Sequence, residues 1–576
     1  MREGAGNRTR GAGRTTRSAG MAAAQAQFGA HARAARLGAP VEEVLGAAEQ
    51  ARAEMRARGT HAPRTQRGAG TDRPPHEGLL TRRQVLAGGA ALAGSVVAAG
   101  GPARALARTL SSVRRPRVAI VGAGLAGLRC AHRLWHHPHA PMAATIYEAN
   151  PERAGGRCWT LRGFFDAGLI TEHGGAFINT PQHAVRRLAR ELGLALEVVS
   201  GGDLPRGEEV YLIDGARYTY REANADWGSL GFPAFRKAAR ELASPAGEQR
   251  LDAMSVPEWL ASTEIGTASR FGKLMLANAV TENGGDPAEL SALDLIELMV
   301  AKPRSTLSPI PGDDERFHVV GGNDQLVSGM IEQLAPDAVH HGHELVAVRA
   351  AGNGSVALAF DVSGSTREVS ADVVVLALPF STLRSVDLTR SGLSPAKRNV
   401  IATLGMGTNA KIHVQLSHKT WPALGFSGAS YGEWDRFCCA WDDSVALGPN
   451  ASPALYNGFP GGHVGAGGLT GAAHGIAPAG DVSWFLDQIE HLYPGTSAAY
   501  GGRAYEDHWA LDPWVKGAYS FLGVGQASSY PAIAAAAEGP LLFAGEHTSI
   551  GNQGFLDGAV ETGDRAAAQV LARVRV

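Results

Sequence analysis

Short apolar runs and one helical run open the folded body of this chain. Arg117–Val121 and Thr145–Tyr147 are uninterrupted apolar stretches of the kind that form buried strands. Between them lies Leu128–Leu134, which reads as a helix, and a glycine-rich turn joins this helix to the first strand. The pattern predicts a strand–turn–helix–strand unit. Later runs at Val373–Leu378 and Leu541–Ala544 predict further strands, and Gly554–Gly563 predicts the opening of a final helix.

Composition adds the class of protein. The chain has 576 residues, of which 44% are hydrophobic and 19% are charged, which is typical of a globular protein with about two to four structural units. The 74 glycines show no three-residue period, which excludes a collagen-like chain. Four cysteines are too few for a disulfide scaffold.

Charge is distributed unevenly. Residues 1–80 carry 13 Arg, no Lys and 7 acidic residues, whereas residues 109–576 hold 37 basic and 48 acidic residues, a net charge of −11. An acidic body argues against nucleic-acid binding, which requires a basic surface. We therefore expect no nucleic-acid partner.

The N-terminal segment has the features of a leader. Residues 1–80 are rich in Ala, Gly and Arg and are predicted to be a disordered, low-complexity preamble. Residues 81–107 begin with Arg82-Arg83, continue as an uncharged Ala- and Gly-rich run and end in the A-x-A site Ala105-Leu106-Ala107. This segment resembles a twin-arginine signal, which implies the twin-arginine export machinery as a partner.

Cleavage near Ala107 then predicts an exported protein, periplasmic or extracellular. An uncleaved N-terminal anchor helix is the alternative, although the run is slightly short for a span. A signal that starts near residue 81 is unusually late, so we hypothesise that translation begins downstream, at Met55.

The glycine-rich turn is Gly122-Ala123-Gly124-Leu125-Ala126-Gly127. The first glycine permits the tight turn, the second lets the backbone approach a pyrophosphate, and the third lets helix and strand pack closely. Glu148 ends the second strand, 21 residues after Gly127, where it can accept hydrogen bonds from a ribose. These residues predict a dinucleotide site and leave NAD and FAD both open.

Four further motifs resolve that choice. Arg153-Ala154-Gly155-Gly156-Arg157 follows the second strand, and Glu172-His173-Gly174-Gly175 lies just beyond it. Gly545-Glu546-His547-Thr548 and Gly554-Phe555-Leu556-Asp557-Gly558 occur near the C-terminus. Together they resemble the flavin monoamine oxidase family, which includes polyamine oxidases and L-amino acid oxidases, over roughly residues 115–576.

The resemblance implies FAD as the cofactor and assigns its contacts. Gly122, Gly124, Ala126, Gly127 and Glu148 correspond to the residues that hold the ADP half. Arg153, Gly156 and Arg157 correspond to the loop that approaches the cofactor, and Val346 to the residue whose backbone meets the adenine. Glu546 corresponds to the acid that binds the ribityl chain, and Leu556 to the helix start that faces the flavin pyrimidine.

The resemblance also implies three residues at the reacting end. Lys411 corresponds to a lysine that holds a water near the flavin and assists reoxidation. Tyr519 and Phe555 correspond to the aromatic pair that flanks the substrate amine. Ala518 stands where covalently flavinylated members have Cys, so we expect FAD to be bound non-covalently.

Substrate preference is less defined by sequence. Amino-acid oxidases of this family commonly carry an Arg just after Gly174-Gly175, whereas this chain has Ala176–Asn179 there. Arg316 is a candidate substitute for that carboxylate clamp. Glu282 and Asp286 are candidate acids that attract a cationic substrate, with a solvated surface position as the alternative for each.

The fold expected from the resemblance is α/β. A Rossmann-like FAD-binding domain would be built from the discontinuous segments 115–195, 318–400 and 538–576. It would be interleaved with an α+β substrate-binding domain at 196–317 and 401–537, which pairs a mixed sheet with helices, mainly within residues 225–320.

The expected reaction is oxidation of a primary or secondary amine to an imine by hydride transfer to flavin N5, with oxygen reduced to hydrogen peroxide. The imine is hydrolysed to an aldehyde and ammonia or an amine. An L-amino acid oxidase or dehydrogenase, a non-catalytic flavoprotein and an NAD-linked dehydrogenase are the alternatives.

Two histidine clusters are candidate metal ligands. His132 and His136 are one helical turn apart, and His340, His341 and His343 form a second group, but both read as basic surface turns. We predict no metal site.

Overall fold

The computed structural model describes residues 116–199, 207–300, 307 and 314–574, and Pro116–Val576 forms one compact unit. The predicted preamble and signal at residues 1–107 and the hypothetical start at Met55 lie outside the described residues. Each helix in the described ranges is too short or too polar to cross a membrane.

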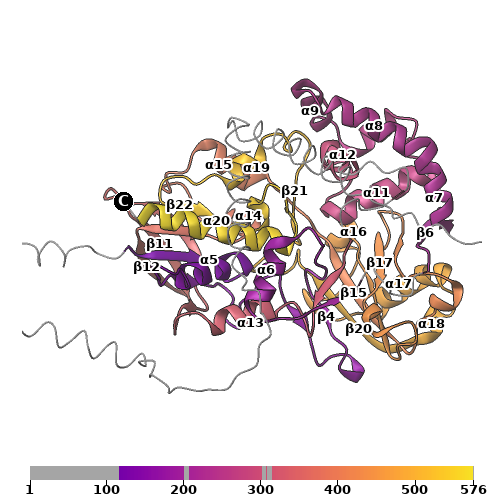
Figure 1. The fold of residues 1–576 in the computed structure, drawn as a ribbon, viewed down its shortest axis with the longest axis horizontal. Helices are drawn as coiled ribbons and strands as arrows, with labels where there is room; N and C mark the ends of the chain where they lie inside the picture. The colour runs from indigo at the N-terminus through magenta and orange to yellow at the C-terminus, as the bar shows by residue number, and fades with distance from the viewer. Residues whose placement is uncertain (1–115, 200–206, 301–306, 308–313, 575–576) are drawn as a thin grey trace, which may run out of the picture. The chain divides into compact units, whose positions relative to one another are not determined.

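A five-stranded parallel sheet forms one half of the fold (Figure 1). A parallel sheet packed against helices confirms the α/β prediction, and its strands come from three separated stretches of the chain. Their order across the sheet is β22 (Leu541–Phe543), β13 (Val373–Leu376), β1 (Val118–Val121), β2 (Thr145–Tyr147) and β9 (Val339–His340).

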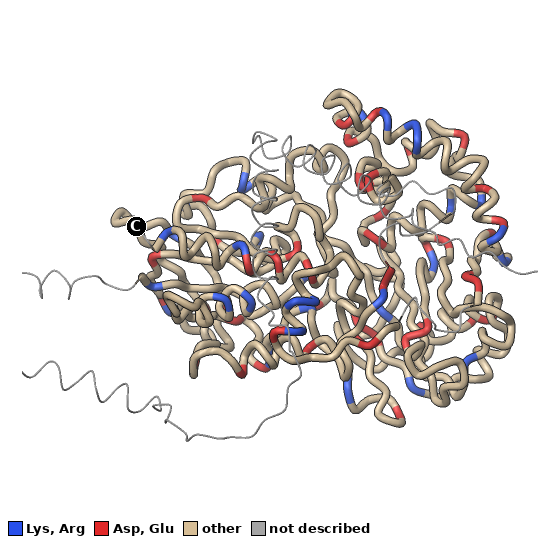
Figure 2. Tube along the Cα trace, in the orientation of Figure 1, with Lys and Arg blue, Asp and Glu red and all other residues tan. Residues whose placement is uncertain are grey.

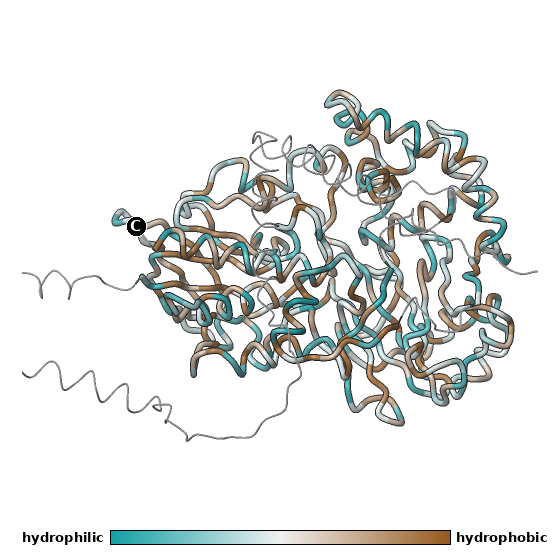
Figure 3. The backbone as a smooth tube through the Cα atoms, viewed as in Figure 1, coloured by the Kyte–Doolittle hydropathy of each residue, from teal (hydrophilic) through white to brown (hydrophobic). Residues whose placement is uncertain are grey.

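Both faces of this sheet are covered, which explains the uninterrupted apolar runs. Val118 and Ile120 point to a helical layer, whereas Ala119 and Val121 point to a layer containing a three-stranded antiparallel sheet. Brown hydrophobic stretches run through this region in Figure 3. The helical layer is formed by α5 (Leu125–Trp135), α6 (His183–Glu191), α13 (Gln325–Glu332) and α20 (Leu556–Val574). The three-stranded sheet is formed by β10 (Glu344–Ala350), β11 (Val356–Val362) and β12 (Ser365–Ala371).

A six-stranded sheet forms the other half. The prediction of a mixed sheet is wrong, because every neighbouring pair in it is antiparallel. Its order is β16 (Ser430–Tyr431), β17 (Cys439–Asp442), β18 (Ala454–Gly458), β15 (Ala410–Leu416), β20 (Tyr500–His508) and β19 (His474–Ile476).

Strand β15 is buried along its whole length but has two unlike faces. Ile412, Val414 and Leu416 pack into a hydrophobic cluster with helix α17 (Ala479–Leu492). The alternate residues Lys411 and His413 therefore point to the opposite side of the sheet. A buried polar face on a central strand marks the region where the site is found.

A helical subregion follows. The helical prediction for residues 225–320 holds as far as Val300, whereas Phe317–Val319 forms strand β8. Two of its helices begin with capping boxes, at Thr219/Glu222 and Ser255/Glu258, which satisfy the first backbone N–H groups. Its helices are α7 (Tyr220–Asp226), α8 (Phe232–Glu241), α9 (Pro245–Asp252), α10 (Val256–Ala261), α11 (Arg270–Asn283) and α12 (Ala292–Val300), with a π-helical turn at Trp227–Gly231.

Short elements connect these parts. The two-stranded pairs are β3 (Thr160–Leu161) with β4 (Thr171–Glu172), β5 (Leu196–Val198) with β8 (Phe317–Val319), β6 (Val210–Ile213) with β7 (Ala216–Thr219), and β14 (Gly405–Met406) with β21 (Ser520–Phe521). The short helices are α14 (Phe380–Leu383), α15 (Pro395–Thr403), α16 (Gly462–Gly467), α18 (Thr496–Ala499), α19 (Tyr530–Ala535) and the 3-10 turn Glu546–Thr548.

The histidine interpretation is corrected in part. His136 is exposed, but His132 is buried, and its Nε2 lies 3.0 Å from Oε1 of Gln333. Burial lowers the pKa of His132. His132 is therefore a neutral residue of α5 that packs against the end of α13, and it is not part of a basic surface turn.

Lys397 on α15 generates a prediction about stability. Its buried Nζ donates to the carbonyls of Ala534 (2.9 Å) and Ala536 (2.8 Å), and burial lowers its pKa from 10.5 to about 7. Between these two values the unfolded chain binds a proton that the folded protein lacks. The free energy of unfolding from this group therefore rises with pH through that window and is constant below it.

We expect the difference in unfolding free energy between the wild type and Lys397→Met to change with pH by up to about 1.4 kcal/mol per pH unit above pH 7. Denaturant unfolding from pH 6 to pH 10 measures it. The exposed Lys237→Met is the control and should show a flat difference. A flat difference for Lys397→Met as well would contradict a buried neutral lysine.

Candidate active site

The glycine-rich turn has one open position. Gly122 has φ of +103°, and a Cβ there would lie 2.7 Å from the Ala377 carbonyl oxygen. A Cβ at Gly127 would lie 2.0 Å from the carbonyl oxygen of Gly122. A Cβ at Gly124 would meet nothing within 4 Å, and Gly124 lines the main cavity together with Ala126 in the first turn of α5. Two glycines thus serve packing, and the middle one leaves room for a ligand at the positive end of a helix.

Glu148 anchors this turn. Its carboxylate accepts hydrogen bonds from the backbone N–H groups of Ala123 (2.7 Å) and Asn150 (2.8 Å). Burial raises the pKa of Glu148, against the effect of these two bonds. Because each carboxylate oxygen has more than one lone pair, Glu148 can still accept from a ribose hydroxyl in the cavity that it lines.

Val346 lies at an irregularity of β10. The pairing with β11 shifts between Leu345 and Ala347, which leaves Val346 as the extra residue of a bulge. Val346 is 36% exposed and lines the same cavity. His343, which directly precedes β10, lines it as well. His343 was not predicted as a site residue.

Hydrogen bonds to Glu546 join its own segment to three others. Its carboxylate accepts from Nη1 of Arg157 (2.8 Å), Oγ of Ser520 (2.8 Å) and the backbone N–H of Gly554 (2.8 Å). Arg157 also donates to the carbonyl of Ala518 (2.7 Å). Burial would raise the pKa of Glu546, but the charges of Arg157 and His547 and the hydrogen bonds from Arg157 and Ser520 together outweigh it, and the pKa is lowered. Glu546 is therefore a fixed anion.

The other loop arginine is held differently. Arg153 donates to the carbonyl of Gly156 (2.7 Å), and its guanidinium carbon lies 4.0 Å from the ring centroid of Trp159. Burial lowers the pKa of Arg153. Both Arg153 and Gly156 line the cavity.

Lys411 lies at the other end of the cavity. Its buried Nζ donates to the carbonyls of Glu172 (2.8 Å) and Gly174 (2.6 Å) and lies 5.6 Å from the ring centroid of Trp441. Burial lowers the pKa of Lys411. The two carbonyls account for two of the three N–H groups of an ammonium, which leaves one for the cavity.

Tyr519 and Phe555 line the same cavity as this lysine. The hydroxyl of Tyr519 donates to the carbonyl of Thr281, which fixes its ring against the end of α11. Leu556 begins α20, and its side chain fills the space beside Gly175, where a Cβ would be only 2.9 Å from Cδ2 of Leu556. The helix start and the Gly174-Gly175 turn are therefore packed directly together.

One cavity of about 710 Å³ joins the two ends. It is within the range of cofactor and ligand sites. All the predicted site residues line it: Gly122, Gly124, Ala126, Glu148, Arg153, Gly156, Arg157, Val346, Lys411, Tyr519, Glu546, Phe555 and Leu556, with the sole exception of Gly127.

Of the three candidate substrate-binding residues, one lines the cavity and two do not. Glu282 lines the cavity, together with Glu209, Asp314 and Glu315, which sequence reasoning missed. Asp286 does not line it, because its carboxylate accepts from the backbone N–H of His463 (2.8 Å). Arg316 is also absent from the described lining, and its guanidinium carbon lies 5.5 Å from the ring centroid of Phe317.

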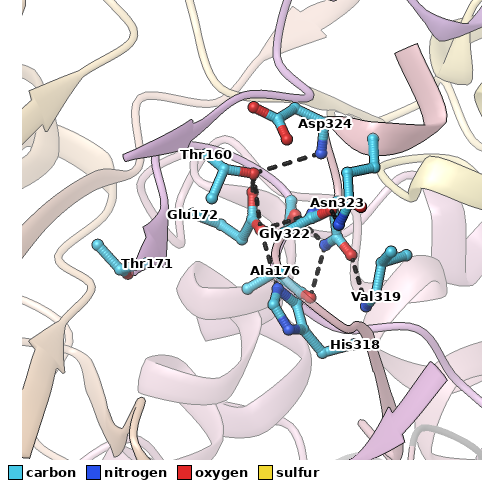
Figure 4. A network of polar contacts seen from close by, with 12 residues as sticks. Thr160, Thr171, Glu172, Ala176, His318, Val319, Gly322, Asn323 and Asp324 are labelled. Atoms are coloured by element: carbon cyan, nitrogen blue, oxygen red, sulfur yellow. Dashed lines mark hydrogen bonds and ion pairs between the residues drawn. The ribbon is translucent and has the colours of Figure 1, made fainter. Parts of the chain in front are cut away.

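A buried polar network fixes the loop that binds Lys411 (Figure 4). Glu172 accepts from Nε2 of His318 (2.8 Å), from Oγ1 of Thr160 and from the backbone N–H of Asn323 (2.8 Å). Asn323 in turn donates to the carbonyls of Gly175 and Ala176, both at 2.9 Å. Burial opposes a charge on His318, but Glu172 and Glu197 outweigh it and raise its pKa to about 9.

Across the described chain, Lys and Arg are dispersed among Asp and Glu (Figure 2). The acids in the cavity are therefore a local concentration of one charge rather than part of a uniformly acidic surface.

Comparison with known proteins identifies the family. The family model described as flavin containing amine oxidoreductase matches residues 125–571, so the chain belongs to that family. Putrescine oxidase of Kocuria rosea is 26% identical over 481 residues, which cover 79% of this chain and 95% of the relative. The L-glutamate oxidase precursor of Streptomyces viridosporus is 25% identical over 593 residues, covering 81% and 87%.

Solved structures support the same fold. Cyclohexylamine oxidase from Brevibacterium oxydans has a TM-score of 0.66 at 21% identity and covers 80% of this chain and 100% of its own. Putrescine oxidase bound to putrescine has a TM-score of 0.65 at 23% identity, with coverage of 80% and 100%. The protein is a flavin-dependent amine oxidoreductase with FAD as its cofactor. The cavity fits this cofactor, because Gly124 leaves the space that a pyrophosphate needs.

A glycine pair tests the cofactor half of the site. We expect Gly124→Ala to fold normally but to bind FAD at least about tenfold more weakly, because its Cβ enters only the ligand space. Gly127→Ala should instead lose stability, because its Cβ would collide with the Gly122 carbonyl. Flavin fluorescence titration of the apoprotein and circular dichroism separate the two effects. Unchanged FAD affinity in Gly124→Ala would place the pyrophosphate elsewhere.

Ala518 predicts the mode of attachment. It has no thiol, and burial raises the pKa of the two cavity thiols, Cys158 and Cys439, well above the usual range, so neither is a thiolate at neutral pH. We expect acid precipitation of the holoenzyme to release all its flavin into the supernatant. Yellow colour retained in the washed pellet would show a covalent bond instead.

Proposed function

We propose that this protein oxidises a primary or secondary amine to an imine, which water hydrolyses to an aldehyde and ammonia or a smaller amine. FAD, when bound, would accept the hydride of the C–H bond, which carries both electrons, while the amine nitrogen loses a proton; oxygen would then take up the two electrons with two protons as hydrogen peroxide. The family membership and the continuous cavity from Gly124 to Lys411 support this reaction.

The chain's own contribution is position and electrostatics. The rings of Tyr519 and Phe555 line the reacting end, where they exclude water and confine the amine. Lys411 supplies an N–H group, and positive charge when it is protonated, at the end of the cavity where Trp441 also lies. Glu546 and Arg157 keep the segments that carry Ala518 and Gly554 in register with the loop at Gly156.

The acidic lining carries the choice of substrate. Glu209, Glu282, Asp314 and Glu315 line the same cavity as Tyr519. Burial raises the pKa of the Tyr431 hydroxyl and of the Cys439 thiol, and the charges of Glu209, Glu282 and Glu315 raise both further. Carboxylates concentrated around a partly buried space favour a cationic ligand. We therefore propose an amine with a second cationic centre, such as a diamine, whose far ammonium lies among these acids.

An L-amino acid substrate is the alternative, and one relative is an L-glutamate oxidase by name. Its carboxylate would require a cation near the reacting end. The arginines in the described lining are Arg153 and Arg157, and both lie in the GGR loop with the partners given above. The lysines of the lining are Lys411, which is bound to two carbonyls, and Lys516. The four acids of the same lining disfavour a substrate carboxylate and therefore this alternative. A non-catalytic flavoprotein is disfavoured by the combination of Lys411, Tyr519 and Phe555 in one cavity.

We also propose export. The twin-arginine-like segment at residues 81–107 would pass the folded holoprotein to the twin-arginine machinery, with cleavage near Ala107 and a periplasmic or extracellular mature enzyme. This route suits a protein whose cofactor is inserted before transport.

Two amines that differ by one charge test the substrate proposal. We expect Glu282→Gln to raise KM for putrescine about tenfold, because a charge pair near the cavity wall is lost, and to leave KM for butylamine within about twofold. Peroxide formation measures both. The matched control Glu289→Gln, an exposed acid outside the described lining, should change neither value. Equal effects on the two amines, or oxidation of L-amino acids in preference to both, would contradict the proposal.

A further inference from the structure

A second buried polar network lies directly behind Lys411. Asp507 on β20 is paired with Lys411 on β15 in the antiparallel register, so the two side chains project from the same face of the sheet. Asp507 is fully buried. The amine oxidation described above does not require it.

Asp507 is bound by three imidazoles. Its Oδ1 lies 2.7 Å from Nδ1 of His173 and 2.6 Å from Nδ1 of His474, and its Oδ2 lies 3.0 Å from Nε2 of His413. His474 also contacts Asp512 at 3.1 Å. Ligands of a tetrahedral zinc ion, at about 2.0–2.1 Å from the metal, are roughly 3.3 Å apart. The shorter spacing here is that of hydrogen bonds.

His173 connects this network to Lys411 through the backbone. The carbonyl groups that bind Lys411 belong to Glu172 and Gly174, the residues on either side of His173. The backbone N–H of His173 donates to Trp159 (3.0 Å), and its carbonyl accepts from Nε1 of Trp509 (2.9 Å). Its ring stacks on Trp159 with centroids 3.6 Å apart. Backbone, ring and ring nitrogen of His173 are therefore all constrained.

We propose that His173 and Asp507 are positioning residues for Lys411. His173 fixes the two carbonyls that bind the amine of Lys411, and Asp507 places a buried negative charge beside that amine. The proposal rests on the role of Lys411 in the proposed function. Reoxidation transfers two electrons from the reduced cofactor and two protons to oxygen, giving hydrogen peroxide. A protonated Lys411 stabilises the negative charge that develops on oxygen during this transfer.

The charges around this group set the direction of the effect. Burial lowers the pKa of Lys411, and Asp443, Asp507 and Glu172 oppose that effect. Burial would raise the pKa of Asp507, but its bonds to His173, His413 and His474 outweigh burial and hold it well below its usual value. Asp507 is thus an anion across the working range of pH. Removing its charge makes Lys411 lose its proton at lower pH.

Stopped-flow spectroscopy of the holoenzyme separates the half-reactions. Enzyme reduced anaerobically with its amine is mixed with oxygen, and the rate of flavin reoxidation is followed from pH 6 to pH 10. We expect Asp507→Asn and His173→Leu to slow reoxidation about tenfold or more, while reduction by saturating amine changes less than twofold. In Asp507→Asn, the loss of rate at high pH should begin at lower pH than in the wild type. His173→Gln, which can still donate to Asp507, should recover most of the rate.

Two controls make the outcomes decisive. His463→Gln removes an exposed histidine that is also bound to an aspartate, Asp286, and should leave both half-reactions unchanged. Lys411→Met tests the underlying role. If it reoxidises at the wild-type rate, the role of Lys411 in the proposed function is wrong.

If Lys411→Met is slow but Asp507→Asn and His173→Leu retain the wild-type rate and pH profile, the positioning proposal is overturned. Should Asp507→Asn fail to fold, the comparison of His173→Leu with His173→Gln decides the question. Stoichiometric zinc in the holoenzyme, lost together with the reoxidation rate on chelation, would overturn it as well and make this a metal centre.

Discussion

The ion pair between the partly buried Arg157 and the buried Glu546 is the interaction on which the site depends. Glu546 follows strand β22, Arg157 follows strand β2, and the carboxylate also binds Ser520 and the backbone at the start of α20. These segments belong to different parts of the chain, and a single anion satisfies polar groups from all of them. Such a pair contributes little net stability when compared with apolar packing, but loss of either partner would leave a buried charge unpaired. Its main effect is to fix where the segments meet.

The distribution of charge follows from the same principle at both ends of the cavity. At the cofactor end, each charged group has a defined partner: Glu148 has two backbone N–H groups, and Arg153 has a carbonyl and an aromatic ring. At the reacting end, Lys411 is bound only by carbonyls and an indole face, with carboxylates at a distance. The first arrangement fixes the charged groups that line the cofactor end, whereas the second leaves one N–H group of the Lys411 ammonium for the cavity, as the proposed function requires.

Much of the fold and of the candidate site can be predicted from the sequence, because it depends on short local patterns of residues. The strand, turn and helix at residues 117–134 follow from a continuous apolar run and the spacing of three glycines, and the structure contains them with ends shifted by a few residues. Of the fourteen site residues predicted from the family motifs, thirteen line one cavity. The antiparallel sheet was not predictable, because strand direction depends on connections between distant segments. The same applies to Asp286, whose partner His463 is 177 residues away, and to the contact of His173 with Asp507 over 334 residues. The one available signal was the alternation of polar residues in Lys411, His413 and Gln415 within an apolar strand.

That alternation constrains how the gene can change. Strand β15 is buried along its length: its apolar residues face one hydrophobic core, and its polar residues face the opposite side, where Lys411 lines the cavity and His413 contacts Asp507. Loss or gain of a single codon between Ala410 and Leu416 would exchange the two faces of the residues that follow it. A deletion before Lys411 would turn its amine into the core beside α17 and present isoleucine to the cavity. Point substitutions on the polar face can alter the chemistry of the site one position at a time. Insertions and deletions within these seven residues are expected to abolish activity.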